Sequence, residues 1–146
     1  MKKLLVLVLF CISFISCDPK VISHEISFFL NNKTNQNLLI TSDYSKSCIN
    51  GETTLFIGDS VCVVKYTDHR VTVGIPPFND LNKVVWVLVK VYSKDGKLLK
   101  TWDNKDEQSL KSDFFNESKW RVHREDKADG SAKISWTYDI TEESFK

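Results

Sequence analysis

The sequence predicts an all-β protein, an immunoglobulin-like β-sandwich of about eight strands, with a small up-and-down β-barrel as the alternative. Three observations lead to this class. Short runs of alternating apolar and polar residues recur along the chain, with turn residues about every 8–12 positions. Aromatic and β-branched residues, which favour strands, are abundant. Ala, the strongest helix former, occurs only as Ala128 and Ala132.

Strands are expected throughout the first half of the domain. Ile26, Phe28 and Leu30 alternate with Glu25 and Ser27, which is the pattern of a half-buried strand. Turn-forming Asn, Gly, Asp and Pro residues separate this strand from the segments that follow it. Similar patterns predict further strands at residues 38–42, 53–57, 61–67 and 71–75.

The second half is expected to hold four strands, at residues 84–89, 97–102, 120–123 and 132–140. The first of these is apolar on both faces, as a central strand covered on each side would be. The last shows the clearest alternation, from Ala132 to Ile140. Asp95-Gly96 predicts a two-residue hairpin turn. Residues 103–113 are expected to form a charged, solvated loop with room for one helical turn.

Length and charge restrict the function classes. The chain has 146 residues, which suits one domain with its own core. Its 20 Lys and Arg residues nearly balance 19 Asp and Glu residues, and only three of the basic residues are Arg. Without an overall positive field or an Arg-rich surface, a nucleic-acid partner is not expected.

The N-terminus has the features of an export signal. Positive residues 2–3 precede an apolar run at residues 4–16, which is shorter than the roughly 20 residues that a membrane-spanning helix needs. The ending Ser16-Cys17 resembles the lipobox of bacterial lipoproteins, although Phe14 stands where Leu, Val or Ile is usual. In that family the Cys is acylated and becomes the first residue of the mature protein. The alternative is a plain secreted protein in which Cys17 is an ordinary thiol.

The lipobox resemblance implies that the chain is divided into three parts. Residues 1–16 would be a signal peptide, residues 17–23 a lipidated tether and residues 24–146 a single β-sandwich domain. Two or three acyl chains on Cys17 would hold the protein on a membrane without any transmembrane helix. The implied location is the cell envelope, with the lipid in the outer membrane. Loss of the signal would leave a net charge of −1.

Residues 55–61 resemble the nucleophile block of GDSL-type serine hydrolases, in which Ser60 would be the nucleophile. Those enzymes place a helix after the Ser, whereas residues 61–66 have the pattern of a strand. They also use a late Asp-x-x-His to activate the Ser, because Ser is a weak nucleophile without a base. Residues 66–69 and 120–123 end in His but lack the Asp in place. We therefore expect a hairpin turn here, and no enzyme.

Asp59-Ser60-Val61 also resembles the Asp-Ser/Thr-apolar sequence that Bacteroidota modify with O-linked glycan. A turn at this point would leave the Ser60 hydroxyl accessible. Ser60 is therefore a candidate glycosylation site.

Cys48 and Cys62 are the cysteines left for pairing in a mature chain that begins at Cys17. Exported proteins permit disulfides, and a bridge closing this loop would contribute about 3 kcal/mol. In a simple meander, strand 53–57 separates the two cysteines, beyond the roughly 5.5 Å between Cα atoms that a bridge needs. A bridge therefore requires the segments to face each other across two sheets; otherwise both cysteines are buried free thiols.

The remaining candidate groups are histidines and tryptophans. The three histidines lie in different segments without metal-ligand spacing, and the only Met is Met1, so no metal or cofactor is expected. Trp86 and Trp136 lie in apolar strand patterns and are expected in the core. Trp102 and Trp120 border the charged loop and are expected to be the exposed pair. They are the candidate binding surface, where their rings could stack on a sugar.

Residues 115–120 and 135–143, together with Ser16-Cys17-Asp18, resemble small exported lipoproteins of Bacteroidota whose β-sandwich domains often lack an assigned activity. In that phylum an acidic residue soon after the lipidated Cys, here Asp18, is associated with export to the outer face. The resemblance implies a lipid-anchored, non-enzymatic envelope protein that presents its β-sandwich to a protein or glycan partner. The alternatives are an envelope inhibitor or immunity lipoprotein, served by the charged loop, and the GDSL-like hydrolase.

Overall fold

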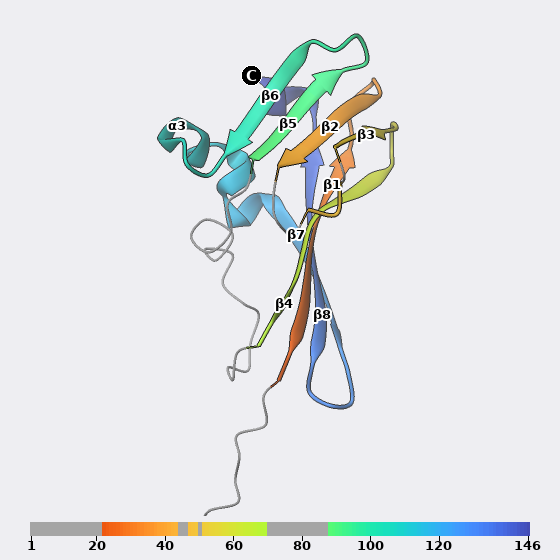
Figure 1. Ribbon diagram of the computed structural model, residues 1–146, viewed down its shortest axis with the longest axis vertical. Helices are drawn as coiled ribbons and strands as arrows, with labels where there is room; N and C mark the ends of the chain where they lie inside the picture. Colours follow the sequence, from red (N-terminus) through yellow and green to blue (C-terminus); the bar gives the residue numbers. More distant parts are fainter. Residues whose placement is uncertain (1–21, 44–46, 50, 70–87) are drawn as a thin grey trace, which may run out of the picture.

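The structure is a computed structural model that describes residues 22–43, 47–49, 51–69 and 88–146 (Figure 1). In these ranges eight strands form two packed four-stranded sheets, so the expected β-sandwich is confirmed. Neither sheet closes into a barrel within the part of the chain that the structure describes. The strand predicted at residues 71–75 lies outside the described residues, as do residues 84–87 of the strand predicted at 84–89, with Trp86.

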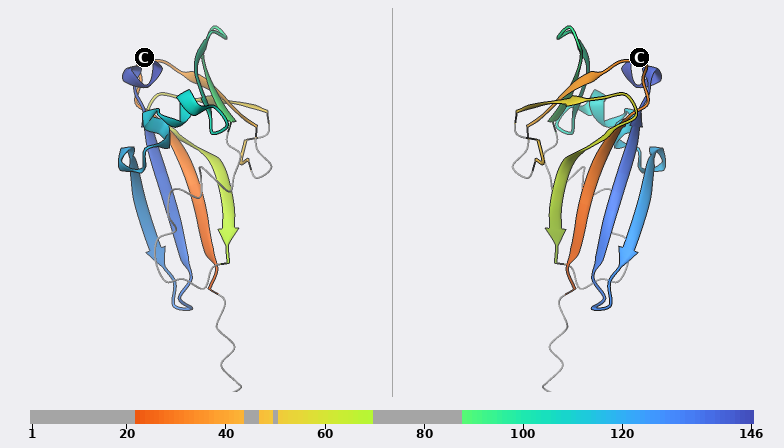
Figure 2. Two further views of the ribbon diagram at one scale, coloured as in Figure 1. Left: turned by 90° about the vertical axis from the view of Figure 1, so that its left-hand side faces the viewer. Right: turned by 90° about the vertical axis from the view of Figure 1, so that its right-hand side faces the viewer.

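Sheet A contains the longest strands and has a parallel pair at its centre. Its order is β4 (Ser60–Asp68), β1 (His24–Asn32), β8 (Ala132–Ile140) and β7 (Trp120–Asp126), which Figure 2 shows side by side. β1 and β8 run parallel in continuous register, whereas β4 and β7 are antiparallel to their neighbours. Sheet A is therefore built around one pairing between segments far apart in the sequence.

Sheet B is wholly antiparallel and lies at the upper end of the molecule in Figure 1. Its order is β3 (Glu52–Leu55), β2 (Leu38–Asp43), β5 (Leu88–Ser93) and β6 (Leu98–Asp103). The chain passes from sheet A to sheet B between β1 and β2, and returns between β3 and β4. These two crossings lie at the same end of the sandwich, because both contact the last residue of β1.

The chain between β6 and β7 contains short helical segments, and one helical turn lies within the charged loop predicted at residues 103–113. They are α3 (Glu107–Leu110), η1 (Asp113–Phe115) and η2 (Glu117–Lys119), and η3 (Glu142–Phe145) follows β8. Asp106 caps α3, because its carboxylate accepts hydrogen bonds from the backbone N–H groups of Gln108 and Ser109. Phe114 and Phe115 of η1 are buried, so this loop contributes to the core.

Aromatic rings fill the space between the sheets. The Phe28 ring lies 6.4 Å from Trp136 and 6.5 Å from Tyr66, both stacked, and meets the edge of Trp120 at 5.6 Å. In β8 the buried residues alternate strictly with the more exposed ones, as the sequence predicts. Such ring pairs add to the burial energy of each side chain. The core therefore extends through the centre of sheet A.

Two local predictions differ from the structure. β3 ends at Leu55 rather than at residue 57. The hairpin between β5 and β6 has three turn residues instead of two, since the backbone N–H of Ser93 donates to the carbonyl oxygen of Lys97 at 2.8 Å. Gly96 supplies the left-handed conformation, with φ of 79°, that ends a three-residue hairpin turn.

We predict that Phe28→Ala lowers the free energy of unfolding by about 3–5 kcal/mol, because it leaves a cavity among three rings. Phe28 is 2% exposed. The matched control is Phe56→Ala at a residue that is 56% exposed, where a change within about 0.5 kcal/mol is expected. Urea unfolding of the two variants measures both values, and equal losses would contradict the placement of Phe28 in the core.

Candidate functional site

Asn32, the last residue of β1, is a fully buried polar residue with every side-chain group bonded. Its Nδ2 donates to the carbonyl oxygens of Gln36 at 2.8 Å and Leu55 at 3.1 Å. Its Oδ1 accepts from the Thr34 backbone N–H at 3.0 Å and from the Thr34 hydroxyl at 2.7 Å. Burying an amide without hydrogen-bond partners costs free energy. These bonds therefore fix the path of the segment that contains Thr34 and Gln36 and of the segment that follows Leu55.

The backbone of Asn32 also holds the segment that returns the chain to sheet A. Its N–H donates to the carbonyl oxygen of Asp59, and its carbonyl oxygen accepts from the N–H of Gly58, both at 2.9 Å. Within that segment the N–H of Asp59 donates to the carbonyl oxygen of Phe56 at 3.1 Å. Gly58 has φ of 82°, the left-handed conformation that this turn requires. Residues 56–59, called the apolar turn below, are therefore held in one conformation.

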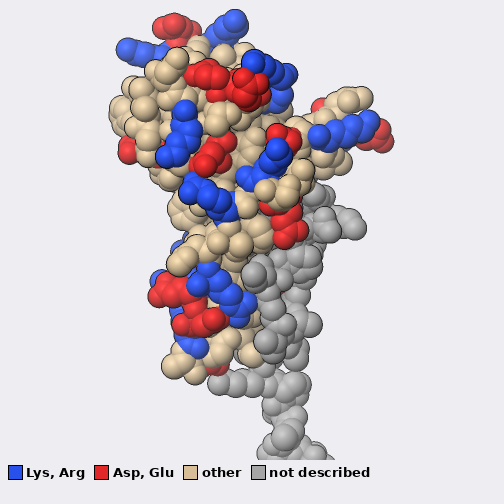
Figure 3. Space-filling model, turned by 180° about the vertical axis from the view of Figure 1, so that it is seen from behind, with Lys and Arg blue, Asp and Glu red and all other residues tan. Residues whose placement is uncertain are grey.

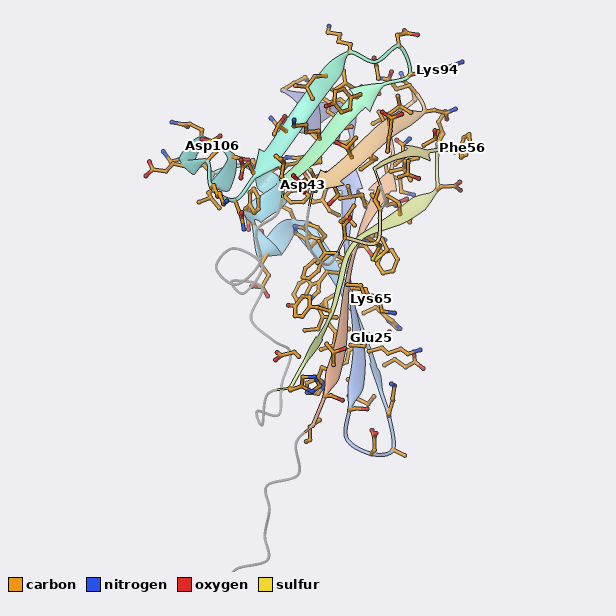
Figure 4. All side chains as sticks on the ribbon, in the orientation of Figure 1. Glu25, Asp43, Phe56, Lys65, Lys94 and Asp106 are labelled. Atoms are coloured by element: carbon orange, nitrogen blue, oxygen red, sulfur yellow. The ribbon has the colours of Figure 1, made fainter. Side chains whose placement is uncertain are left out.

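The apolar turn presents two large apolar side chains to solvent. Phe56 and Ile57 are each 56% exposed, and Phe56 projects away from the strands (Figure 4). The Ile57 N–H donates to Asn37 Oδ1 at 3.2 Å. The carbonyl oxygen of Leu55 accepts a hydrogen bond from Asn32 Nδ2, and β3 ends at this residue. Adjacent exposed apolar residues on a fixed backbone are a feature of interaction surfaces.

The sequence predicts a hairpin turn at residues 58–60, whereas the turn connects strands of two different sheets. The exposure of residues 56–57 was missed because they were assigned to a strand. One signal was present in the sequence. Alternation that buries Leu55 leaves Phe56 facing outward, next to a second apolar residue and a turn-forming Gly. An apolar residue at an outward position just before a turn therefore marks a candidate contact residue.

The apolar turn lies at the opposite end of sheet A from the N-terminal side of the domain. β1 begins at His24 and ends at Asn32, which contacts the turn. A strand of this length spans about 26 Å at roughly 3.3 Å per residue. In Figure 1 the start of β1 is at the lower end and sheet B at the upper end. The start of β1 is thus separated from the apolar turn by the length of this strand.

Ser60 begins β4 beside the apolar turn, and its side chain joins a row of polar groups. Its hydroxyl donates to Asn31 Oδ1 at 3.3 Å, and Asn31 Nδ2 donates to Asp139 at 2.7 Å. Arg121 pairs with the same carboxylate at 2.7 Å. Ser60 is exposed, as a glycosylation site must be, but its modification stays a prediction. The partner of its hydroxyl is an amide oxygen, which is not a catalytic base.

The prediction that Trp102 and Trp120 are exposed is wrong. Trp102 is 1% exposed and stacks on Phe114 at 4.4 Å. Trp120 is 6% exposed, and its Nε1 donates to the carbonyl oxygen of Phe114 at 2.6 Å. The physical reason is that the charged loop folds back through η1 and places Phe114 between the two indoles. A stacking platform formed by these two tryptophans is thereby excluded.

A cleft of about 370 Å³ lies beside Trp102 and Tyr138, close to η3. Trp102 is almost fully buried and so exposes very little surface to the cleft. Burial raises the pKa of the Tyr138 hydroxyl above its usual value. Lysines and carboxylates share the rim in equal numbers, which favours no single charge of ligand. These rim residues are Lys100, Lys119, Lys146, Asp113, Asp139 and Glu143.

Cys48 and Cys62 are free thiols that the fold brings together. The simple meander that would separate them does not occur, since β3 pairs in sheet B while Ser47 bridges Val64 of β4. Burial, followed by a hydrogen bond and the charge interaction with Cys48, raises the pKa of the Cys62 thiol to about 12. Cys48 is exposed and Cys62 half-buried, so the expectation of two buried thiols holds for neither.

Surface charge and the remaining candidate groups point to no further site. On the face seen in Figure 3, Lys and Arg side chains are interspersed with Asp and Glu. Among the described residues no three His, Cys, Asp or Glu side chains are grouped to hold a metal ion.

No helix in the described ranges has the length and apolarity to cross a membrane. Cys17 and the predicted signal peptide lie outside the described residues.

Comparison with known proteins adds no assignment: no protein-family model matches the chain, and no curated protein matches it. The case for a function therefore depends on the residues described above.

We predict that Asn32→Ala lowers the free energy of unfolding by about 2–4 kcal/mol. The substitution removes four hydrogen bonds and leaves buried carbonyl and amide groups without partners, at about 1–3 kcal/mol for such a group. Asn35→Ala is the matched control, because Asn35 is exposed; a change within about 0.5 kcal/mol is expected there. Denaturant unfolding measures both, and a loss at Asn32 no larger than that at Asn35 would contradict its role.

Proposed function

We propose that the chain is a lipid-anchored, non-enzymatic protein of the cell envelope that binds a protein partner through the apolar turn. The observation that carries this proposal is the exposure of Phe56 and Ile57 on a backbone held by hydrogen bonds to Asn32 and Asn37. A preorganised turn loses little conformational entropy when it binds. Aromatic and large apolar residues are also enriched among the side chains that dominate binding energy.

The position of the turn supports an anchored role. With acyl chains on Cys17, the N-terminal end of β1 would be the end held at the membrane. The apolar turn contacts the other end of β1, about 26 Å farther along the strand. Phe56 and Ile57 would then face away from the membrane that carries the anchor. A partner protein is accordingly a better occupant for them than the lipid of that membrane.

Two observations favour a protein partner over a glycan or a substrate. The tryptophans that could have stacked on a sugar, Trp102 and Trp120, are buried. Ser60, the nucleophile of the hydrolase alternative, begins a strand instead of preceding a helix. Its hydroxyl is bonded to the amide oxygen of Asn31. Each of these features supports a binding role at the apolar turn.

An envelope inhibitor or immunity lipoprotein is the form of this proposal in which the partner is an enzyme. The charged loop assigned to that role, residues 103–113, is followed directly by Phe114 and Phe115, which pack inward and contribute to the core. The apolar turn is the better candidate for contacting an enzyme, since its two apolar side chains already project into solvent.

We predict that Phe56→Ser with Ile57→Ser weakens partner binding at least tenfold while the fold is retained. A photo-crosslinking amino acid at position 56 of the full chain should yield one protein adduct in intact cells. That partner, once purified, should bind the double-serine variant at least tenfold more weakly than wild type, since buried apolar contacts are lost.

The matched control for the double variant is Leu98→Ser, which removes another large apolar side chain that is 50% exposed. Binding of this variant should equal that of wild type. An equal loss for Leu98→Ser, or a crosslink to glycan in place of protein, would contradict the proposed site.

The anchor is tested separately. We predict that Cys17→Ala moves the protein from the membrane fraction to the soluble fraction, because the acylated thiol is absent and the remaining signal run is too short to span a bilayer. Cys48→Ala is the matched control and should stay in the membrane fraction. Metabolic labelling with a fatty-acid analogue should mark the wild type and the control only. Membrane retention of Cys17→Ala would contradict the lipid anchor.

A further inference from the structure

Segment 47–49 lies against the free edge of β4. Ser47 and Val64 form an antiparallel bridge, and the Cys48 N–H donates to the carbonyl oxygen of Val63 at 3.4 Å. β4 is the edge strand of sheet A, whereas segment 47–49 lies in the chain between β2 and β3 of sheet B. This contact therefore connects the two sheets along one side of the sandwich.

β4 has a β-bulge beside this contact. Phe28 pairs with Val64 and Phe29 with Cys62, so Val63 is an extra residue in β4. An extra residue bends a strand and redirects its side chains. Although Cys48 is in register with Val63, its side chain forms a hydrogen bond with the neighbouring Cys62. Neighbouring strands lie about 4.8 Å apart, so Cα atoms one position out of register are on the order of 6 Å apart. A disulfide accommodates roughly 4.4–6.8 Å.

We propose that Cys48 and Cys62 form a disulfide that fastens segment 47–49 to β4 and so links the two sheets covalently. The oxidant is a small-molecule or protein disulfide. The thiolate of exposed Cys48 attacks one sulfur of that disulfide, which gives a mixed disulfide and releases one thiolate. The Cys62 thiolate then attacks the Cys48 sulfur, forms the internal bond and releases the second thiolate. The protein loses two protons and two electrons, and the external disulfide is reduced to two thiols.

The order of these attacks follows from exposure and charge. Cys48 is exposed, whereas Cys62 is half-buried and donates to the carbonyl oxygen of Val64 at 3.5 Å. Burial is the main cause of the raised pKa of Cys62, and the hydrogen bond and charge interaction with Cys48 raise it further. Once Cys48 is in a mixed disulfide, that contribution is absent and Cys62 ionises more readily. The second attack is therefore promoted by the first.

The test uses the full chain in detergent with Cys11→Ser and Cys17→Ser, so that Cys48 and Cys62 are the only thiols. The protein is incubated with oxidised glutathione and examined by thiol titration, intact mass and peptide mapping. The expected result is joint loss of both thiols, a mass decrease of two hydrogens and a linked Cys48–Cys62 peptide. The unfolding equilibrium constant should fall on the order of 100-fold, as for a loop of about 15 residues.

Two variants distinguish the internal bond from general thiol reactivity. With Cys62→Ser added, the reaction should stop at one glutathione on Cys48, which supports Cys48 as the first thiol to react. With Cys48→Ser added, Cys62 should react at least tenfold more slowly. The proposal is overturned if the folded two-thiol protein keeps both thiols, carries two glutathiones or forms a dimer through Cys48. None of these results depends on whether the apolar turn binds a partner.

Discussion

The hydrogen bonds of Asn32 hold the two segments in which the chain passes from one sheet of the sandwich to the other. Such a crossing removes backbone N–H and C=O groups from the strand ladders, and those that are buried still need partners. At the end of β1 one side chain meets this need for both crossings at once, because it bonds Thr34 and Gln36 of one segment and Leu55 of the other. The two crossings are thereby coupled to each other and to sheet A.

This coupling explains why a turn with two exposed apolar residues has a single conformation. The strand before it ends at Leu55, whose carbonyl oxygen is bound by Asn32, and the turn itself is bonded to the backbone of the same residue. Phe56 and Ile57 cannot fold inward without breaking these bonds. Elsewhere the chain does bury its rings, since Phe114 covers both Trp102 and Trp120. Exposure at the apolar turn is thus enforced by polar contacts beneath it.

Sequence patterns predicted the parts of this fold that depend on local alternation. The strand at residues 132–140 follows its apolar period so closely that its buried face could be assigned residue by residue. The site depends instead on contacts between distant segments. Nothing in the run of turn residues around Asn32 distinguishes it from Asn35, although one is buried and the other exposed.

The wrong prediction for the two tryptophans and the question left open for the two cysteines have the same origin. The burial of Trp102 and Trp120 depends on a loop that folds back over them, and the proximity of Cys48 and Cys62 depends on which sheet contains β3. Alternation within one strand specifies its buried face but not the identity of its neighbours. Strand order is a property of the whole chain, so these placements could not be predicted from local pattern.

The parallel pairing of β1 with β8 also determines when sheet A can form. β1 is among the first parts of the domain to be synthesised, yet its central partner spans Ala132–Ile140. Contacts of such long sequence separation form slowly, because a large loop must close before they add any stability. Sheet A cannot be completed while the chain is still emerging from the ribosome. The topology therefore leaves β1 without its central partner until synthesis of the domain is nearly finished.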